Sequence, residues 1–165
     1  MLETVDRLEN DFDVERIEGY GLEAELEQGL DPARPHVRLN PRNHDSAPIV
    51  VVFSTFPGLH VRFGRWYGEL FPSCGCDACD EPAEGEIERL HEMVDDVVAG
   101  RFCEAIRRPL ISFRGIGWRE TKFWSPVGIR AQRSRIDGLR ARDMAGGRRR
   151  LDLNWKPWCR RRTIS

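Results

Sequence analysis

The sequence has little lysine, no long apolar run and no amino-terminal targeting pattern. Only Lys122 and Lys156 are lysines among 26 basic residues, so arginine carries almost all of the positive charge. The longest apolar run, Pro48 to Phe53, is far shorter than the ~20 residues that a membrane-spanning helix needs. The first ten residues, MLETVDRLEN, contain no basic region followed by an apolar one. We therefore expect no membrane span and a cytoplasmic location.

The composition is that of a globular chain. Of 165 residues, 40% are apolar and 32% are charged, with eight Phe and five Trp to fill a core. Gly and Pro number 15 and 10, too few for a collagen-like or low-complexity chain. The length suits one domain, and we expect residues 1–165 to form a single one.

The two parts of the chain have opposite charge. Residues 1–100 carry 22 acidic and 8 basic side chains, whereas residues 101–165 carry 5 acidic and 18 basic, although the whole chain has a net charge of only −1. Such a division can mark a surface for an acidic partner, or two parts that pack together and neutralise each other. Because no linker separates the parts, we favour the second interpretation.

Apolar periodicity predicts an α+β fold. Helical spacing is present in residues 2–12 and again in residues 82–99, where Pro82 suits a first turn and Gly100 an end. Alternating or continuous β-branched runs predict strands over residues 34–40, 49–53, 59–63, 102–113, 118–124 and 150–155, and a short helix is expected over residues 135–144 with Ser134 as its cap. Since strands and helices cluster rather than alternate, we expect an antiparallel sheet with one long helix and one or two short helices on one face.

Three cysteines form a C-x-C-x-x-C pattern before the long helix. Cys74, Cys76 and Cys79 can turn their thiolates toward one point, as a structural zinc ion requires. Zinc prefers four ligands, and the fourth is not identified by any second motif. His91 lies about 15 Å along the helix at 1.5 Å per residue, so we do not expect it to be that ligand. The remaining candidates are His44, His60, Asp77, Cys103 and Cys159.

Two other interpretations of the same cysteines stay open. Cys76 and Cys79 form a C-x-x-C at a helix start, where the helix dipole lowers a thiol pKa, as in thiol–disulfide redox proteins. The parallel βαβ unit that usually precedes such a motif is missing from the pattern. The third interpretation is a tight loop in which the thiols simply pack.

The loop sequence also carries a family resemblance. Residues 74–80 read CGCDACD, preceded by an apolar hairpin and followed by a helix. Over roughly His36 to Phe102 the chain resembles an uncharacterised, mainly actinobacterial family, a domain of unknown function with a CGCDACD loop signature. The resemblance implies no activity and no cofactor, and it does not extend beyond Cys103.

The basic part of the chain interleaves arginines with tryptophans. Such a mixture can bind single-stranded nucleic acid, because cations contact phosphates and aromatic rings stack on bases. The residues that this hypothesis uses are Arg148, Arg149, Arg150, Arg160, Arg161, Arg162, Trp155 and Trp158. Trp118 and Trp124 lie in the same region, and tryptophans on strands more often pack a core and lend their faces to arginine.

No motif for a known reaction is present. The sequence contains no Walker loop, no G-x-S-x-G and no H-E-x-x-H. The acidic residues Glu88, Glu92 and Asp95 follow helical spacing, which predicts a solvent-facing helix side rather than a catalytic cluster. The sequence therefore favours a non-enzymatic domain that binds a protein partner, with zinc as the one candidate cofactor. A redox protein and a nucleic-acid binder are the alternatives.

Overall fold

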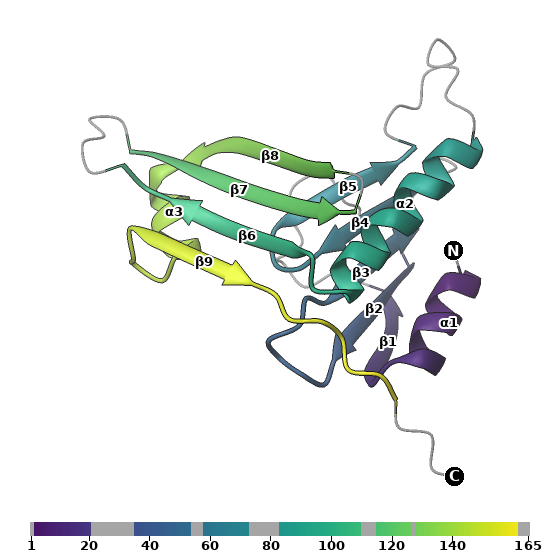
Figure 1. Ribbon diagram of the computed structural model, residues 1–165. Helices are drawn as coiled ribbons and strands as arrows, with labels where there is room; N and C mark the ends of the chain where they lie inside the picture. The colour runs from purple at the N-terminus through teal and green to yellow at the C-terminus, as the bar shows by residue number, and fades with distance from the viewer. Residues whose placement is uncertain are drawn as a thin grey trace.

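The computed structural model describes residues 2–20, 35–53, 58–72, 83–109, 115–126 and 128–161. Within these residues the chain forms three helices and nine strands (Figure 1). The strands make two antiparallel sheets, one of five strands in the order β1-β2-β3-β4-β5 and one of four in the order β8-β7-β6-β9. The α+β class and the antiparallel pairing are confirmed, although the strands are divided between two sheets.

The five-stranded sheet is a simple meander. Its strands are β1 (Val14–Tyr20), β2 (Pro35–Pro41), β3 (Ile49–Phe53), β4 (Leu59–Phe63) and β5 (Tyr67–Phe71). The predicted hairpin between the runs 49–53 and 59–63 is confirmed, because Val51 lies opposite Val61. Side chains alternate across the pleat, so Val37 and Leu39 of β2 are buried on one face while Arg38 between them points to the other.

Two helices cover one face of this sheet, and their buried sides follow from the sequence period. The helix α1 (Leu2–Asp11) buries Val5 and Leu8, and α2 (Ala83–Val98) buries Leu90 and Val94. Both predicted helices are confirmed. At the end of α2, Gly100 takes a φ of 71°, a left-handed conformation that glycine adopts without the cost of a Cβ.

The four-stranded sheet comes mainly from the basic part of the chain. It contains β6 (Phe102–Arg107), β7 (Ile116–Ser125), β8 (Gly128–Asp137) and β9 (Arg150–Asn154), and α3 (Gly138–Met144) connects β8 to β9. Phe102 and Phe123 pack on Phe63 and Tyr67 of the first sheet, with the rings of Phe102 and Phe123 4.5 Å apart. The acidic and basic parts of the sequence thus share one core cluster.

The predicted start of the third helix is wrong. The helix begins at Gly138 rather than Arg135, and its cap is Asp137, whose carboxylate accepts hydrogen bonds from the backbone N–H groups of Leu139 and Arg140. Residues 128–137 instead form β8, paired along its whole length with β7. The strands β1 and β5 were also not predicted.

Candidate functional site

The cysteine site and part of the arginine site cannot be placed on the fold. Cys74, Cys76, Cys79 and Arg162 lie outside the described residues. The zinc and redox interpretations therefore stay predictions. In the part of the chain that the structure describes, no three His, Cys, Asp or Glu side chains are grouped as metal ligands would be.

The two arginine groups of the nucleic-acid hypothesis are not brought together. Arg148 and Arg149 precede β9 and Arg150 begins it, whereas Arg160 and Arg161 follow β9 and lie beside α1 (Figure 1). Between these groups the chain runs the length of β9 and a further stretch of extended backbone. A single ligand contacting both groups would have to span that whole distance.

The tryptophans of the same hypothesis point inward. Trp158 is only 4% exposed, and its indole N–H donates to the carbonyl of Ala47 at 2.9 Å. Its ring meets that of Phe12 edge to face, with centroids 5.9 Å apart. Trp155 is half-buried and donates its indole N–H to Glu104 at 3.1 Å. Trp158 is thus a core residue and its ring is closed to base stacking.

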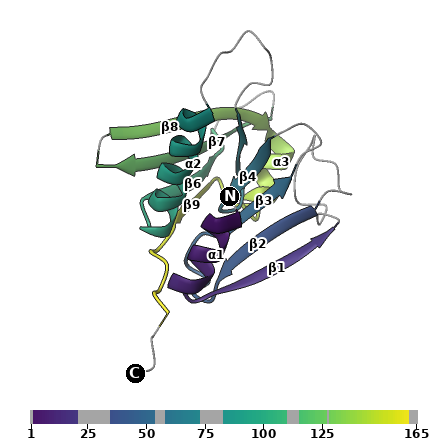
Figure 2. The ribbon, with the colours of Figure 1, turned by 90° about the vertical axis from the view of Figure 1, so that its right-hand side faces the viewer.

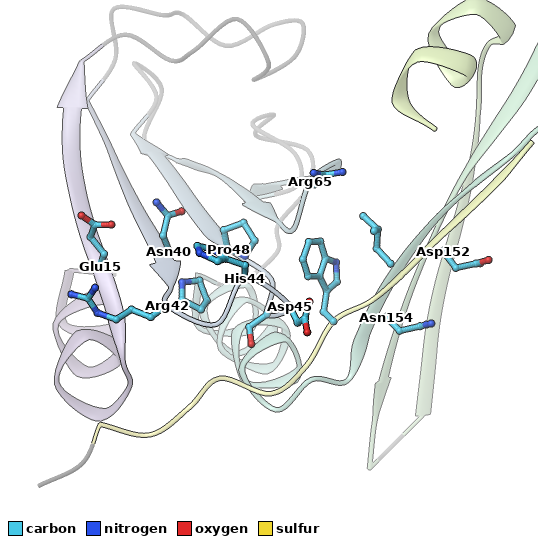
Figure 3. Close-up of a pocket in the computed structure, with 13 residues that line it drawn as sticks. Glu15, Asn40, Arg42, His44, Asp45, Pro48, Arg65, Asp152 and Asn154 are labelled. Carbon is cyan, nitrogen blue, oxygen red and sulfur yellow. The ribbon is translucent and has the colours of Figure 1, made fainter. Parts of the chain in front are cut away.

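A polar groove of about 770 Å³ separates the two sheets (Figure 3). One wall comes from β1, β2 and the loop after β2, and the other comes from β9. The lining carries both signs of charge, with Glu15 and Asp45 against Arg42 and Arg65. Arg42 is itself paired with Asp13 at 3.3 Å. The groove therefore has no consistent preference for an anion or a cation.

Beside this groove lies the most deeply buried carboxylate among the described residues, that of Glu104. Glu104 is 1% exposed, and its two oxygens accept four N–H donors from both sides of the junction between the sheets. The donors are the backbone amides of Arg65, Trp66 and Tyr67 at 2.7–2.9 Å and the indole of Trp155. Burial raises the pKa of Glu104, and the four hydrogen bonds act in the opposite direction. With each oxygen already accepting two donors, Glu104 holds the sheets together and is not free to act as a general base.

The outer face of the four-stranded sheet is the second candidate surface. The strand register places its side chains in rows across β9, β6, β7 and β8, because directly opposite residues share a face. We call this surface the basic sheet face. It consists of Arg107, Trp118, Glu120, Lys122, Trp124, Ile129, Arg133, Arg135, Arg150 and Asp152.

Arginine side chains on the basic sheet face are held in place by their neighbours. Glu120 pairs with Arg133 at 3.2 Å and with Arg107 at 3.6 Å. The guanidinium of Arg133 lies 4.2 Å from the ring centroid of Trp118, so Trp118 lends its face to arginine as expected.

A second carboxylate fixes the other end of this network. Asp152 pairs with both Arg107 and Arg150, and the hydrogen bond from Arg150 lowers the pKa of Asp152 most strongly, followed by that from Arg107. Three arginines thus share two carboxylates across the four strands of the sheet.

The rest of the basic sheet face carries unneutralised charge and exposed apolar area. Lys122 and Arg135 are exposed and form no ion pair with any described residue. The face therefore has five cations against two carboxylates. At one end of it, Trp124 lies opposite Ile129, which is 77% exposed. An arrangement of fixed cations next to an apolar pair can bind an acidic ligand that also has apolar groups.

Most residues of the basic sheet face were not predicted, because β8 was not recognised as a strand. Residues 129, 131, 133 and 135 alternate with 130, 132 and 134 as a strand does. Because nearly every residue of β8 is exposed, and Ile129 and Ala131 share their side with Arg133 and Arg135, the alternation of apolar and polar residues that identifies a half-buried strand is missing.

His91, which we did not expect to be a zinc ligand, takes part in packing between helices. His91 lies on α2, and its ring nitrogen is 3.1 Å from the hydroxyl of Thr4 on α1, so it joins the two helices. The acidic side of α2 is also as predicted, since Glu88, Glu92 and Asp95 are exposed.

The fold and these surfaces define an α+β protein of two antiparallel sheets, one of which has an arginine-rich outer face. The chain belongs to a family of unknown function (DUF6226), whose model matches residues 3–162. The match includes the C-terminal third, which the resemblance seen in the sequence did not reach. No curated protein and no solved structure matches the chain. Among the described residues, no helix has the length and apolar character needed to cross a membrane.

Proposed function

We propose that this protein is a non-enzymatic binding domain whose basic sheet face holds an acidic segment of a partner protein. The observation that carries the proposal is the network in which Arg107, Arg133 and Arg150 are fixed by Glu120 and Asp152. Beside it stand Lys122 and Arg135, which pair with no acidic residue that the structure describes. Side chains that are already ordered lose little conformational entropy when a ligand binds, which favours recognition.

Binding is favoured over catalysis by the state of the carboxylates. Glu104 is saturated with N–H donors, and Glu120 and Asp152 each contact two arginines. A general base needs an oxygen within hydrogen-bond reach of its substrate, and these groups already use theirs within the fold.

A protein partner is favoured over a nucleic acid by the distribution of charge. Glu120 on the interior strand β7 and Asp152 on the edge strand β9 interrupt the cations of the face, so the face offers no continuous row of cations for a phosphate backbone to follow. The ring of Trp118 is covered by Arg133 on one side, whereas Trp124 and Ile129 offer an apolar contact at one end. An acidic peptide with an apolar side chain matches both features.

The proposal includes one structural zinc ion held by Cys74, Cys76 and Cys79, supported by the spacing of these cysteines before α2. Thiolates stay available as ligands in a reducing compartment, and we place the protein in the cytoplasm for that reason.

The test is fluorescence anisotropy with a labelled peptide of about ten glutamates and two central leucines. We expect binding that weakens with added salt, because the Debye length falls to ~3 Å at 1 M. The double variant Lys122→Glu, Arg135→Glu should weaken binding at least about tenfold, since the cations it reverses face the ligand directly.

The matched control is Arg148→Glu, Arg149→Glu, which changes the net charge equally at exposed positions outside the face. Equal losses in both double variants would mean that only the overall charge matters and would overturn the proposal. Tighter binding of an oligothymidylate than of the peptide would overturn the choice of a protein partner.

A further inference from the structure

We infer that the acidic segment which fits the basic sheet face is the helical surface of a second copy of this chain. The inference rests on the proposed function and names its partner. The acidic surface is formed by α1 and α2, which lie together on one side of the molecule (Figure 2). They are joined by the contact of Thr4 with His91 and by the ion pair of Arg7 with Asp95 at 3.5 Å.

This helical surface has a strong excess of negative charge. The two helices contain ten acidic residues and only two basic ones, Arg7 and Arg89. Arg89 is turned toward the first sheet, where it pairs with Glu69 at 2.8 Å. The exposed acidic residues of the surface are Glu3, Asp6, Asp11, Glu84, Glu88, Glu92 and Asp95.

The same surface has exposed apolar side chains that match those of the basic sheet face. Ile87 of α2 is 54% exposed and follows Glu84 by three residues, so both lie on one side of the helix. Leu2 of α1 is 53% exposed. On the other surface, Trp124 and Ile129 stand beside Lys122. The two surfaces are thus complementary in charge, and each has an apolar pair to bury.

The two surfaces cannot satisfy each other within one copy. The inner face of the four-stranded sheet packs on the core through Phe102 and Phe123, so its outer face points away from α1 and α2. Among the described residues, the ion pairs that join the two parts include Arg101 with Asp96 at 2.8 Å and Arg130 with Glu92 at 4.0 Å. Each surface still keeps a net charge, because the basic sheet face has five cations against two carboxylates and the helices have ten acidic residues against two basic ones.

The inferred contact joins two different surfaces of the chain. A helical surface of one copy on the sheet face of the next is a heterologous contact, which builds rings or open chains rather than an isologous dimer. The assembly should depend on salt, because its charges are exposed and screened.

The experiment is sedimentation velocity of the full chain at low and high salt, with two complementary variants. Glu84→Gln, Glu88→Gln removes charge from the helical surface, and Lys122→Gln, Arg135→Gln removes it from the basic sheet face. We expect the unaltered chain to form species above 19.1 kDa at low salt and to return to that mass at high salt. Each variant alone should stay at the monomer mass.

Mixing the two variants gives the decisive result. The variant Glu84→Gln, Glu88→Gln retains its basic sheet face, and the variant Lys122→Gln, Arg135→Gln retains its helical surface. An equimolar mixture should therefore form a dimer of twice 19.1 kDa and no larger species. The control Arg148→Gln, Arg149→Gln should assemble like the unaltered chain.

A mixture that stays monomeric would overturn the head-to-tail contact. A chain that stays monomeric at low salt and still binds the glutamate-rich peptide would overturn the second copy as partner and leave the proposed function intact. A chain that neither self-associates nor binds the peptide would overturn the second copy as partner and also the proposed function.

Discussion

The indole N–H of Trp155 donates to Oε2 of Glu104 at 3.1 Å, and this bond joins the end of β9 to a carboxylate that also receives three amides from the turn between β4 and β5. One side chain therefore connects both sheets. Since Glu104 is only 1% exposed, its carboxylate depends on these four donors for its hydrogen bonds.

Replacing Glu104 with glutamine should destabilise the protein strongly. In Glu104→Gln one oxygen becomes an NH₂ group that faces two N–H donors, and each unsatisfied buried group costs about 1–3 kcal/mol. We expect a loss of roughly 2–4 kcal/mol in the free energy of unfolding, measured with urea. Trp155→Phe removes a single donor and should cost less. Equal stability of Glu104→Gln and the unaltered protein would contradict this role.

Gly64 should not tolerate a side chain. Its φ is 65°, and a Cβ there would lie 2.4 Å from Oε2 of Glu104 and 2.8 Å from the ring of Phe102. Gly146 has a similar φ of 57° with nothing within 4 Å, so Gly146→Ala measures the backbone cost alone. We expect Gly64→Ala to lower the melting temperature further, by the equivalent of at least ~1 kcal/mol. Equal shifts in the two variants would show that the turn can move away from Glu104.

The elements that the sequence predicted are those with a clear contrast between apolar and polar positions. The spacing of Val5 and Leu8 and that of Leu90 and Val94 identify α1 and α2, because each helix buries one stripe. The run 49–53 identifies a central strand, since β3 is buried on both faces. In β8 both sides mix polar with apolar residues and nearly all are exposed, so the same reasoning gave a helix that starts at Arg135.

The pairing of distant strands could not be predicted from local patterns. β6 lies between β7 and β9, and residues 103 and 154 are opposite each other although 51 positions separate them. The basic sheet face results from this pairing, since Arg107, Glu120 and Asp152 come from three strands. Local density of arginine pointed to residues 148–150 and 160–162, of which only Arg150 belongs to this face, and the fold keeps Arg160 and Arg161 away from it.

The two described cysteines should differ in reactivity. Burial raises the pKa of the Cys103 thiol on the outer side of β6, whereas Cys159 is exposed. Because the thiolate is the nucleophile, iodoacetamide near pH 8 should alkylate Cys159 several-fold faster, as site-resolved mass spectrometry would show. Binding of the glutamate-rich peptide should slow Cys103 further. An unchanged Cys103 rate with bound peptide would place that peptide elsewhere.

Asp152 should report the state of the arginine network through its titration. Its pKa is lowered below the ordinary 3.8, first by Arg150 and then by Arg107. Because the pKa of Asp152 is lower in the folded state than in the unfolded state, its ion pairs stabilise the fold at a pH above the pKa of the unfolded state. This stabilisation is lost as the pH falls through the pKa of the folded state. Carboxyl NMR should give a midpoint below 3.8, and Arg150→Gln should move it upward. A midpoint that Arg150→Gln leaves unchanged would contradict the pairing.

The cysteine loop should matter more to folding than the histidine on α2. If Cys76 is a zinc ligand, Cys76→Ser removes metal binding that contributes to folding, whereas His91→Ala loses one hydrogen bond to Thr4, worth about 1 kcal/mol. Elemental analysis of protein purified without chelator should give about one zinc per chain, and Cys76→Ser should lower both zinc content and thermal midpoint. His91→Ala should keep its zinc. A metal-free protein whose thermal midpoint is unchanged by Cys76→Ser would contradict a structural role for the loop. Rapid alkylation of one thiol near neutral pH would then favour redox chemistry at Cys76 and Cys79.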